Sequence, residues 1–143
     1  MANPNSEAVA AMGTYLRRNG VEIAEVVTIG GPSFEAETIE VTHLRSPGMW
    51  KEYIGSLKDG GELTFDLNFL LDDPSHSAAT GLLSQWNSDG VPARDEWEIV
   101  FPNDAATVWL FNGFQTGFEV TAETGDKLAA SVTIQISGKP TLA

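Results

Sequence analysis

From Glu62 onward, polar and apolar side chains alternate, and this alternation constrains the fold more than any other feature of the chain. Successive side chains of a β-strand point to opposite faces, so one face here would carry only leucine and phenylalanine. The preceding Lys58-Asp59-Gly60-Gly61 is typical of a tight turn, because glycine accepts a positive φ without steric cost. We therefore predict a strand over 62–71 with one packed and one solvated face. The apolar positions are Leu63, Phe65, Leu67, Phe69 and Leu71, and the polar ones are Glu62, Thr64, Asp66 and Asn68.

Comparable patterns predict further strands on both sides of this one. The stretch 21–29 is rich in β-branched residues and closes at Gly30-Gly31-Pro32, and a second stretch, 34–42, follows directly. Later strands are predicted at 97–101, 107–111, 118–121 and 128–137. So many strands in one chain predict a mainly β architecture, either a sandwich or a barrel.

One amphipathic helix is predicted among these strands, over 74–87. Asp73 is a suitable N-cap, and Pro74 fits the first helical position because its missing N–H needs no partner there. Apolar residues then recur at helical spacing until Asn87-Ser88-Asp89-Gly90. We expect this helix to pack on the outer side of the sheet. Its apolar face would consist of Ala78, Ala79, Leu82, Leu83 and Trp86.

The chain has 143 residues, which is the size of one domain that buries its own core. We expect a single domain over 1–143, whose first residues, 1–12, form a polar, disordered arm. No apolar run is long enough to span a bilayer, and the first residues lack the basic flank and apolar block of a signal peptide. We therefore expect synthesis in the cytoplasm and no membrane insertion.

A long loop is predicted over 43–61, because this segment lacks a sustained strand pattern and is interrupted by several glycines. It contains one short helical turn at most, in the stretch 49–55. Loops of this length inside a compact domain are uncommon and usually functional. Trp50 and Tyr53 lie in this loop, where large aromatics are costly to leave in water. They either fold back onto their own domain or mark a contact surface.

The charge is strongly acidic and unevenly distributed. The formal net charge is −12, and no lysine or arginine occurs between Arg18 and Arg45, between Lys58 and Arg94, or between Arg94 and Lys127. Proteins that bind nucleic acid by a basic footprint neutralise phosphates with Lys and Arg, so this chain does not fit that class. The polar faces of the predicted strands are small, neutral or acidic. One simple explanation is that the acids only keep the protein in solution.

No catalytic or metal-binding constellation stands out. His43 and His76, the only histidines, lack the spacing of a zinc site, and there is no cysteine for thiolate ligands or disulfides. Asp72-Asp73 could form a pair of catalytic carboxylates, but helix capping explains a carboxylate followed by proline. We expect no enzyme activity, no metal and no cofactor. His43 would lie in the loop, and His76 in the first turn of the helix.

The stretch 31–76 resembles the tail tube (major tail) protein family of long-tailed, lambda-like bacteriophages. The resemblance depends on the order and spacing of several short pieces, since each piece alone is weak. The family commonly has proline and glycine before the Leu-Lys-Asp run, where this chain has Gly55-Ser56. The matching pieces are Gly31-Pro32-Ser33, Ile39-Glu40-Val41-Thr42, Ser46-Pro47-Gly48 and Leu57-Lys58-Asp59-Gly60-Gly61-Glu62.

The resemblance implies a structural virion protein that forms hexameric rings, in which the sheets of the subunits join into one continuous barrel. The rings would stack into a tail tube, assembled in the host cytoplasm and located in the virion tail. Its channel would hold the tape measure protein and later conduct DNA, which acidic strand faces repel rather than bind. Further partners would be the tail terminator and tail tip proteins. The channel-lining residues would be Thr38, Glu40, Thr42, Thr64, Asp66, Asn68, Glu119, Thr121, Glu123, Ser131, Thr133 and Gln135.

The loop over 43–61 would be the contact between rings. It holds basic and aromatic residues in an otherwise acidic chain, so it could dock onto the acidic body of the next ring. We expect it to be mobile in the free subunit and ordered only in the tube. The residues concerned are Arg45, Trp50, Lys51, Tyr53, Lys58 and Asp59.

Two other functions stay open. A related ring protein, such as a tail terminator or a secretion-type tube component, would share the fold but stop at one ring or stack differently. A different class is an acidic β-sandwich binding module or small enzyme with a ligand in the mouth of its barrel. Rings or tubes of purified protein would support the first class, and a persistent monomer the second.

Overall fold

The computed structural model describes residues 11–103 and 105–142 of the chain. Strands dominate it, which confirms the expected mainly β architecture. The arm expected at 1–12 lies almost wholly outside the described residues. The strands are β1 (Tyr15–Arg18), β2 (Val21–Glu22), β3 (Val26–Gly30), β4 (Glu35–Glu40), β5 (Tyr53–Asp59), β6 (Glu62–Asn68), β7 (Asp95–Val100), β8 (Val108–Thr121) and β9 (Ala129–Leu142). The described residues also form two short 3-10 helices, η1 (Pro47–Met49) and η2 (Leu82–Ser84).

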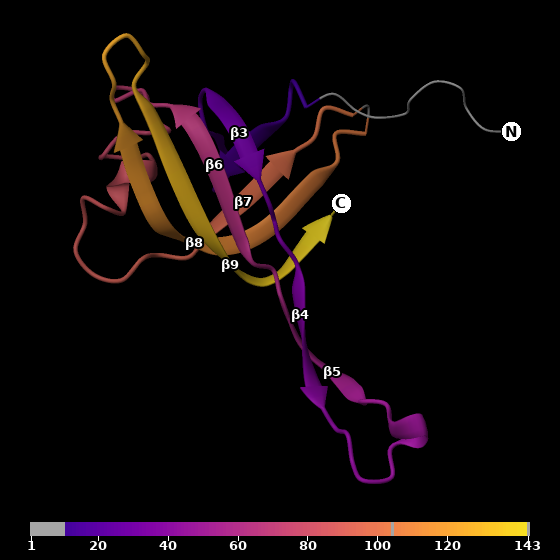
Figure 1. The fold of residues 1–143 in the computed structure, drawn as a ribbon. Coiled ribbons are helices and arrows are strands. Elements are labelled where there is room, and N and C mark those ends of the chain that lie inside the picture. The colour runs from indigo at the N-terminus through magenta and orange to yellow at the C-terminus, as the bar shows by residue number, and fades with distance from the viewer. Residues whose placement is uncertain (1–10, 104, 143) are drawn as a thin grey trace, which may run out of the picture.

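Seven strands form one antiparallel sheet in the order β2-β1-β7-β8-β9-β6-β3. Figure 1 shows that this sheet curls into a half barrel. At its centre, the long strands β8 and β9 pair from Thr121 opposite Ala129 to Trp109 opposite Leu142. β4 and β5 pair only with each other and form a hairpin that projects away from the barrel (Figure 1). The strand predicted at 34–42 therefore forms, but outside the main sheet.

The core lies inside the curl, where the alternating apolar side chains meet. Leu63, Phe65 and Leu67 of β6 are at most 1% exposed, as the alternation predicted. Ile134 and Val132 of β9 lie opposite Leu63 and Phe65. Complete burial of each such side chain contributes about 1.5–3 kcal/mol to stability. The other core residues are Leu16, Ile23, Phe69, Leu82, Trp97, Ile99, Phe111, Ala130 and Ile136.

The strand predicted over 62–71 ends early, at Asn68, and the prediction that Leu71 packs in the core is wrong. Leu71 is 61% exposed. The pairing stops because the backbone finds other partners. The Phe69 N–H donates to the Leu128 carbonyl at 2.9 Å, and the Leu70 N–H donates to Nδ1 of His76 at 3.0 Å. The chain turns away from the sheet at this point.

The helix predicted over 74–87 is also wrong, because that segment is a series of turns in which η2 is the only helix. Gly81 packs so closely on the preceding turn that a Cβ there would lie 2.5 Å from the backbone of His76. Glycine in a helix costs about 1 kcal/mol relative to alanine, which favours the turn. Asp73 caps this turn instead of a helix: its Oδ1 accepts the Ser75 N–H at 2.9 Å and the Ser75 hydroxyl at 2.7 Å.

The beginning of the chain differs from expectation as well. The single strand predicted over 21–29 is divided into β2 and β3, because Glu25 adopts a positive φ of 52° between them. β1 was not predicted, and it pairs with β7 at one side of the sheet. In the part of the chain that the structure describes, no helix is both long and apolar enough to cross a membrane.

Candidate functional site

The face of the sheet opposite the core is open over β6, β9 and β8. The register places Asp66 opposite Ser131, and Ser131 opposite Glu119. Thr64 lies opposite Thr133 in the next row. Neighbouring strands are about 4.8 Å apart, so the backbones of Asp66 and Glu119 lie about 10 Å from each other. We call the outward positions of residues 62–68 of β6, 117–121 of β8 and 129–135 of β9 the open face.

The open face brings together most of the residues that we expected to line a channel. They are Thr64, Asp66, Asn68, Glu119, Thr121, Ser131, Thr133 and Gln135. Thr38 and Glu40 do not join them, because they belong to β4 in the hairpin, and Thr42 follows that strand. Glu123 lies in the loop between β8 and β9. Since β4 has no partner in the main sheet, its polar side is not continuous with the open face.

None of these eight positions carries a base, whereas the exposed Lys139, further along β9, lies near the base of the hairpin. Two arginines of the sheet, Arg17 and Arg18 of β1, are paired with acids of the neighbouring β7. Arg17 contacts Glu98, and the Arg18 Nε lies 3.0 Å from Oδ2 of Asp95. Because these cations are neutralised by their own partners, they do not offset the negative charges of the open face.

The second candidate surface is the β4–β5 hairpin. The prediction of a loop over 43–61 is wrong for Tyr53–Asp59, which is strand β5, and the expected helical turn occurs earlier, as η1. Ile39 of β4 lies opposite Ile54 of β5. We did not predict strand β5, because Gly55 and a register shift interrupt the alternation of its side chains. Its apolar residues were a signal that could have revealed it.

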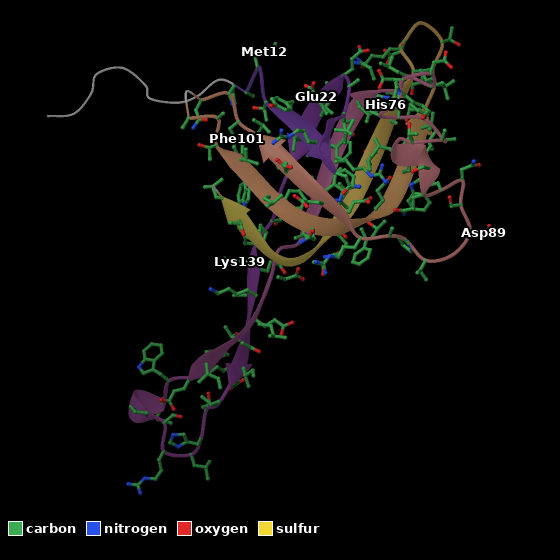
Figure 2. All side chains as sticks on the ribbon, turned by 180° about the vertical axis from the view of Figure 1, so that it is seen from behind. Met12, Glu22, His76, Asp89, Phe101 and Lys139 are labelled. Carbon is green, nitrogen blue, oxygen red and sulfur yellow. The ribbon has the colours of Figure 1, made fainter. Side chains whose placement is uncertain are left out.

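Large apolar side chains of the hairpin are not covered by their own domain. Trp50 is 77% exposed and Tyr53 is 53% exposed, so these aromatics do not fold back onto the barrel. Figure 2 shows that the side chains of the hairpin lie apart from the barrel. A group of large apolar side chains exposed on one hairpin marks an interaction site. The other exposed members are Ile39, Val41, Leu44, Met49, Ile54 and Leu57, which we did not predict as contact residues.

Polar contacts close the tip of the hairpin, residues 41–52. Oε2 of Glu52 accepts the Ser46 hydroxyl at 2.6 Å and lies 3.4 Å from Nε2 of His43. The Ser46 Oγ in turn accepts the His43 N–H at 3.0 Å. The Glu52 N–H donates to Thr42 Oγ1 at 2.9 Å. These contacts define the shape of the tip and engage its only carboxylate.

The base of the hairpin is fixed to the barrel. The Gly61 carbonyl accepts the Ile136 N–H at 3.0 Å and the side-chain amide of Gln135 at 3.1 Å. The ring of Phe34 lies against Trp109, with centroids 5.5 Å apart. Gln135 therefore belongs to the open face and also anchors the hairpin.

Two titratable groups outside these surfaces, His76 and Asp73, stabilise turns. His76 is fully buried in a turn, not in the first turn of a helix, and its ring joins the Leu70 N–H to the Ala24 carbonyl. Hydrogen bonds from the Ser75 hydroxyl and backbone N–H lower the pKa of Asp73. Within residues 11–103 and 105–142, no group of His, Asp and Glu side chains is arranged to hold a metal ion.

Solved structures of a contractile injection system and of gene transfer agent particles contain chains of the same fold. One similar structure is the PVC sheath/tube terminator, in its extended state, of an extracellular contractile injection system. Its TM-score is 0.74 at 14% identity, over 96% of this chain and 98% of that chain. A chain of the native gene transfer agent virion has a TM-score of 0.71 at 18% identity, over 95% of this chain and 99% of that chain. A chain from the tail of the empty gene transfer agent particle, with C6 symmetry, has a TM-score of 0.62 at 20% identity, over 85% and 84%.

A sequence comparison gives the family. No curated protein matches the chain. A family model described as lambda phage tail tube protein, however, matches residues 10–143. The family is described by the tube of the phage tail, and the structural neighbours come from a contractile injection system and from gene transfer agent particles. The chain belongs to the lambda phage tail tube protein family.

Proposed function

We propose that copies of this chain form hexameric rings whose sheets join into one continuous barrel, and that the rings stack into the tail tube. The observation that carries this proposal is the open face, which combines acids with small polar side chains and has no base at the positions named above. In a closed ring this face would line the channel. Thr38, Glu40, Thr42 and Glu123 would contribute at its two ends.

The charge of such a channel suits the passage of DNA. Tight contacts between protein and nucleic acid depend on Lys and Arg that displace counterions from phosphates. Asp66 and Glu119 would instead repel the phosphates, and no cation would hold the DNA back. During assembly in the host cytoplasm the same channel would hold the tape measure protein. Tail terminator and tail tip proteins would bind the two ends of the tube.

The hairpin supplies the contact between rings. It projects from the barrel, and it exposes Trp50 and Tyr53 together with Arg45, Lys51 and Lys58. Burial of this apolar surface against the next ring would drive stacking, while the bases would meet the acidic body of another copy. Asp59 lies at the base of the hairpin, where it accepts the Gly61 N–H at 2.8 Å and shapes the turn.

A single terminating ring is the second candidate function. It is favoured by the likeness to the sheath/tube terminator, a protein of the same fold over nearly the whole of both chains. Such a ring would use the same open face, but further copies of the chain would not stack on it.

Electron microscopy of the purified protein in negative stain tests these functions. Long tubes with a central channel are the expected result. Single rings that do not elongate at high concentration would favour the terminator. A persistent monomer would contradict both and favour an acidic binding module.

A further inference from the structure

The two ends of the subunit differ in chemistry. β6 starts beside the base of the hairpin at Glu62 and ends at Asn68, which lies opposite Ala129 of β9. The loop between β8 and β9 and the segment after Asn68 therefore lie at the end of the barrel that is remote from the hairpin. Figure 1 shows the hairpin and the β8–β9 loop at opposite ends of the molecule.

The remote end combines acids with exposed apolar side chains. Leu71 and Val120 are both exposed there. Glu25 belongs to the same end, because its side chain accepts the Asn68 amide. We call this the far-end surface. It consists of Glu25, Leu71, Asp72, Val120, Glu123 and Asp126, all exposed, with Lys127 as the only base among residues 122–128.

The tip of the hairpin has the complementary composition. Leu44 and Met49 are almost fully exposed, and Trp50 lies beside them in sequence. Arg45 and Lys51 form no salt bridge with any residue that the structure describes. The Glu52 carboxylate contacts Ser46 and His43 rather than either base, and with Arg45 and Lys51 against this single acid the tip keeps a net positive charge.

We propose that the far-end surface is the acceptor for the hairpin tip of a second copy of this chain. The apolar side chains of the tip would contact Leu71 and Val120. Arg45 and Lys51 would form ion pairs with Asp72, Glu123 and Asp126. Because tip and acceptor lie at opposite ends, the contact is head-to-tail, and a contact of this kind repeats without closing on itself. The inference rests on the proposed stacking of rings and specifies which surface receives the hairpin.

The occupant is a copy of this chain because both halves of the contact are on the same molecule. Complementary charge favours this encounter and disfavours wrong partners. Nucleic acid, another candidate for the basic tip, would be repelled by the net charge of −12 of each copy and would leave Leu71 and Val120 uncovered.

Site-specific cross-linking tests the contact directly. The chain has no cysteine, so introduced thiols have no background. Tubes of a Met49→Cys, Leu71→Cys double variant, treated with a short bis-maleimide, should give a ladder of covalent oligomers. The matched control is Met49→Cys with Val91→Cys, since Val91 is more exposed than Leu71, at 92% against 61%, but lies in the loop before β7. Absence of the ladder in assembled tubes, or an equal ladder in the control, would overturn the assignment.

Charge reversal provides a second test that does not require cysteine variants to assemble. Arg45→Glu with Lys51→Glu, and separately Asp72→Lys with Asp126→Lys, should each raise the critical concentration for tube formation at least about tenfold. An equimolar mixture should restore tubes, because every reversed tip then finds a reversed acceptor. If the mixture fails while the wild type forms tubes, the acceptor lies elsewhere. If the wild type itself forms no tubes, the proposed function fails instead.

Discussion

The indole N–H of Trp86 donates a 3.0 Å hydrogen bond to Oε1 of the fully buried Gln115. The other end of the Gln115 amide donates to the Leu82 carbonyl at 3.1 Å. One buried side chain of β8 therefore holds the irregular segment after β6 against the sheet. We predicted that this segment is a helix on the outside of the sheet. It is instead a series of turns, which the hydrogen bonds of Gln115 and the buried Leu82 attach to the sheet.

Replacement of Gln115 by leucine should lower the free energy of unfolding by about 2–4 kcal/mol. The variant leaves the Leu82 carbonyl and the Trp86 N–H without their partner, and each buried unpaired group costs about 1–3 kcal/mol. Urea denaturation followed by tryptophan fluorescence measures the change. Thr116→Val, at the exposed neighbouring position, serves as control and should stay within about 0.5 kcal/mol of the wild type. An equally small effect of Gln115→Leu would show that the anchor is dispensable.

Trp86→Ala should cost about 2–3 kcal/mol, because the loss of a half-exposed ring is added to the loss of the partner of the buried Gln115 Oε1. A fully buried aromatic residue would cost about 3–5 kcal/mol, which is the value that the predicted helix implied. Trp86 is 45% exposed, however, so less apolar contact is lost on truncation. The fully buried Trp97 supplies the comparison, since Trp97→Ala should show the larger loss in the same denaturation experiment. Equal losses for the two variants would mean that Trp86 is covered in solution.

Asp73 should make the subunit acid-sensitive. Hydrogen bonds from Ser75 hold the pKa of Asp73 below its ordinary value of 3.8. A carboxyl whose pKa is lowered in the folded state stabilises the fold at pH values above the pKa that it has in the unfolded chain. This stabilisation is lost as the pH falls through the lowered pKa of the folded state. Asp73→Asn should therefore lose less stability than the wild type between pH 4 and pH 2, measured by thermal melting. Asp72→Asn, at the exposed neighbouring position, should melt with the acid sensitivity of the wild type.

Reversal of charge on the open face should slow DNA ejection without preventing assembly. Asp66→Lys with Glu119→Lys places two cations in the proposed channel, where they would retain phosphates. The rate of ejection from virions carrying the variant is the measurement. Glu22→Lys with Asp89→Lys makes the same change in net charge on other parts of the surface (Figure 2). Normal ejection from the open-face variant would refute the channel assignment.

Truncation of the hairpin aromatics should abolish stacking and leave the fold intact. Trp50→Ala with Tyr53→Ala removes side chains that touch little of their own domain, so the free energy of unfolding should change by less than about 1 kcal/mol. Deletion of residues 47–56 should have the same effect on polymerisation. Tubes of normal length from either variant would rule out the stacking role, whereas an unfolded product would assign the aromatics to the core.

Hydrogen exchange should report a change of the hairpin on assembly. β4 and β5 pair only with each other, so their amides should exchange faster than those of β8 and β9 in the free subunit. We expect protection of residues 35–59 to rise at least about tenfold in tubes, because docking orders a mobile segment. Equal protection in the two states would show that the hairpin is already rigid before it docks.

The sequence by itself determined the core and the electrostatic character of this protein. Alternation has a period of two, so it specifies which side chains of β6 and β9 share a face without knowledge of their partners. The absence of bases over long stretches likewise requires no structure. These two features, with the resemblance of residues 31–76, were enough to identify the fold class and the family.

Only the tertiary structure decided where the strand at 35–40 goes and whether the segment at 74–87 is helical. Ile39 and Val41 alternate as well as Leu63 and Phe65 do, but Ile39 pairs with Ile54 of β5 in a projecting hairpin, and the choice of partner is not local. The helical spacing around Leu82 was overridden by Gly81 and by hydrogen bonds to Gln115, far away in the sequence. The periodicity of a segment indicates which of its faces is apolar. Contacts between distant segments determine which part of the chain covers that face.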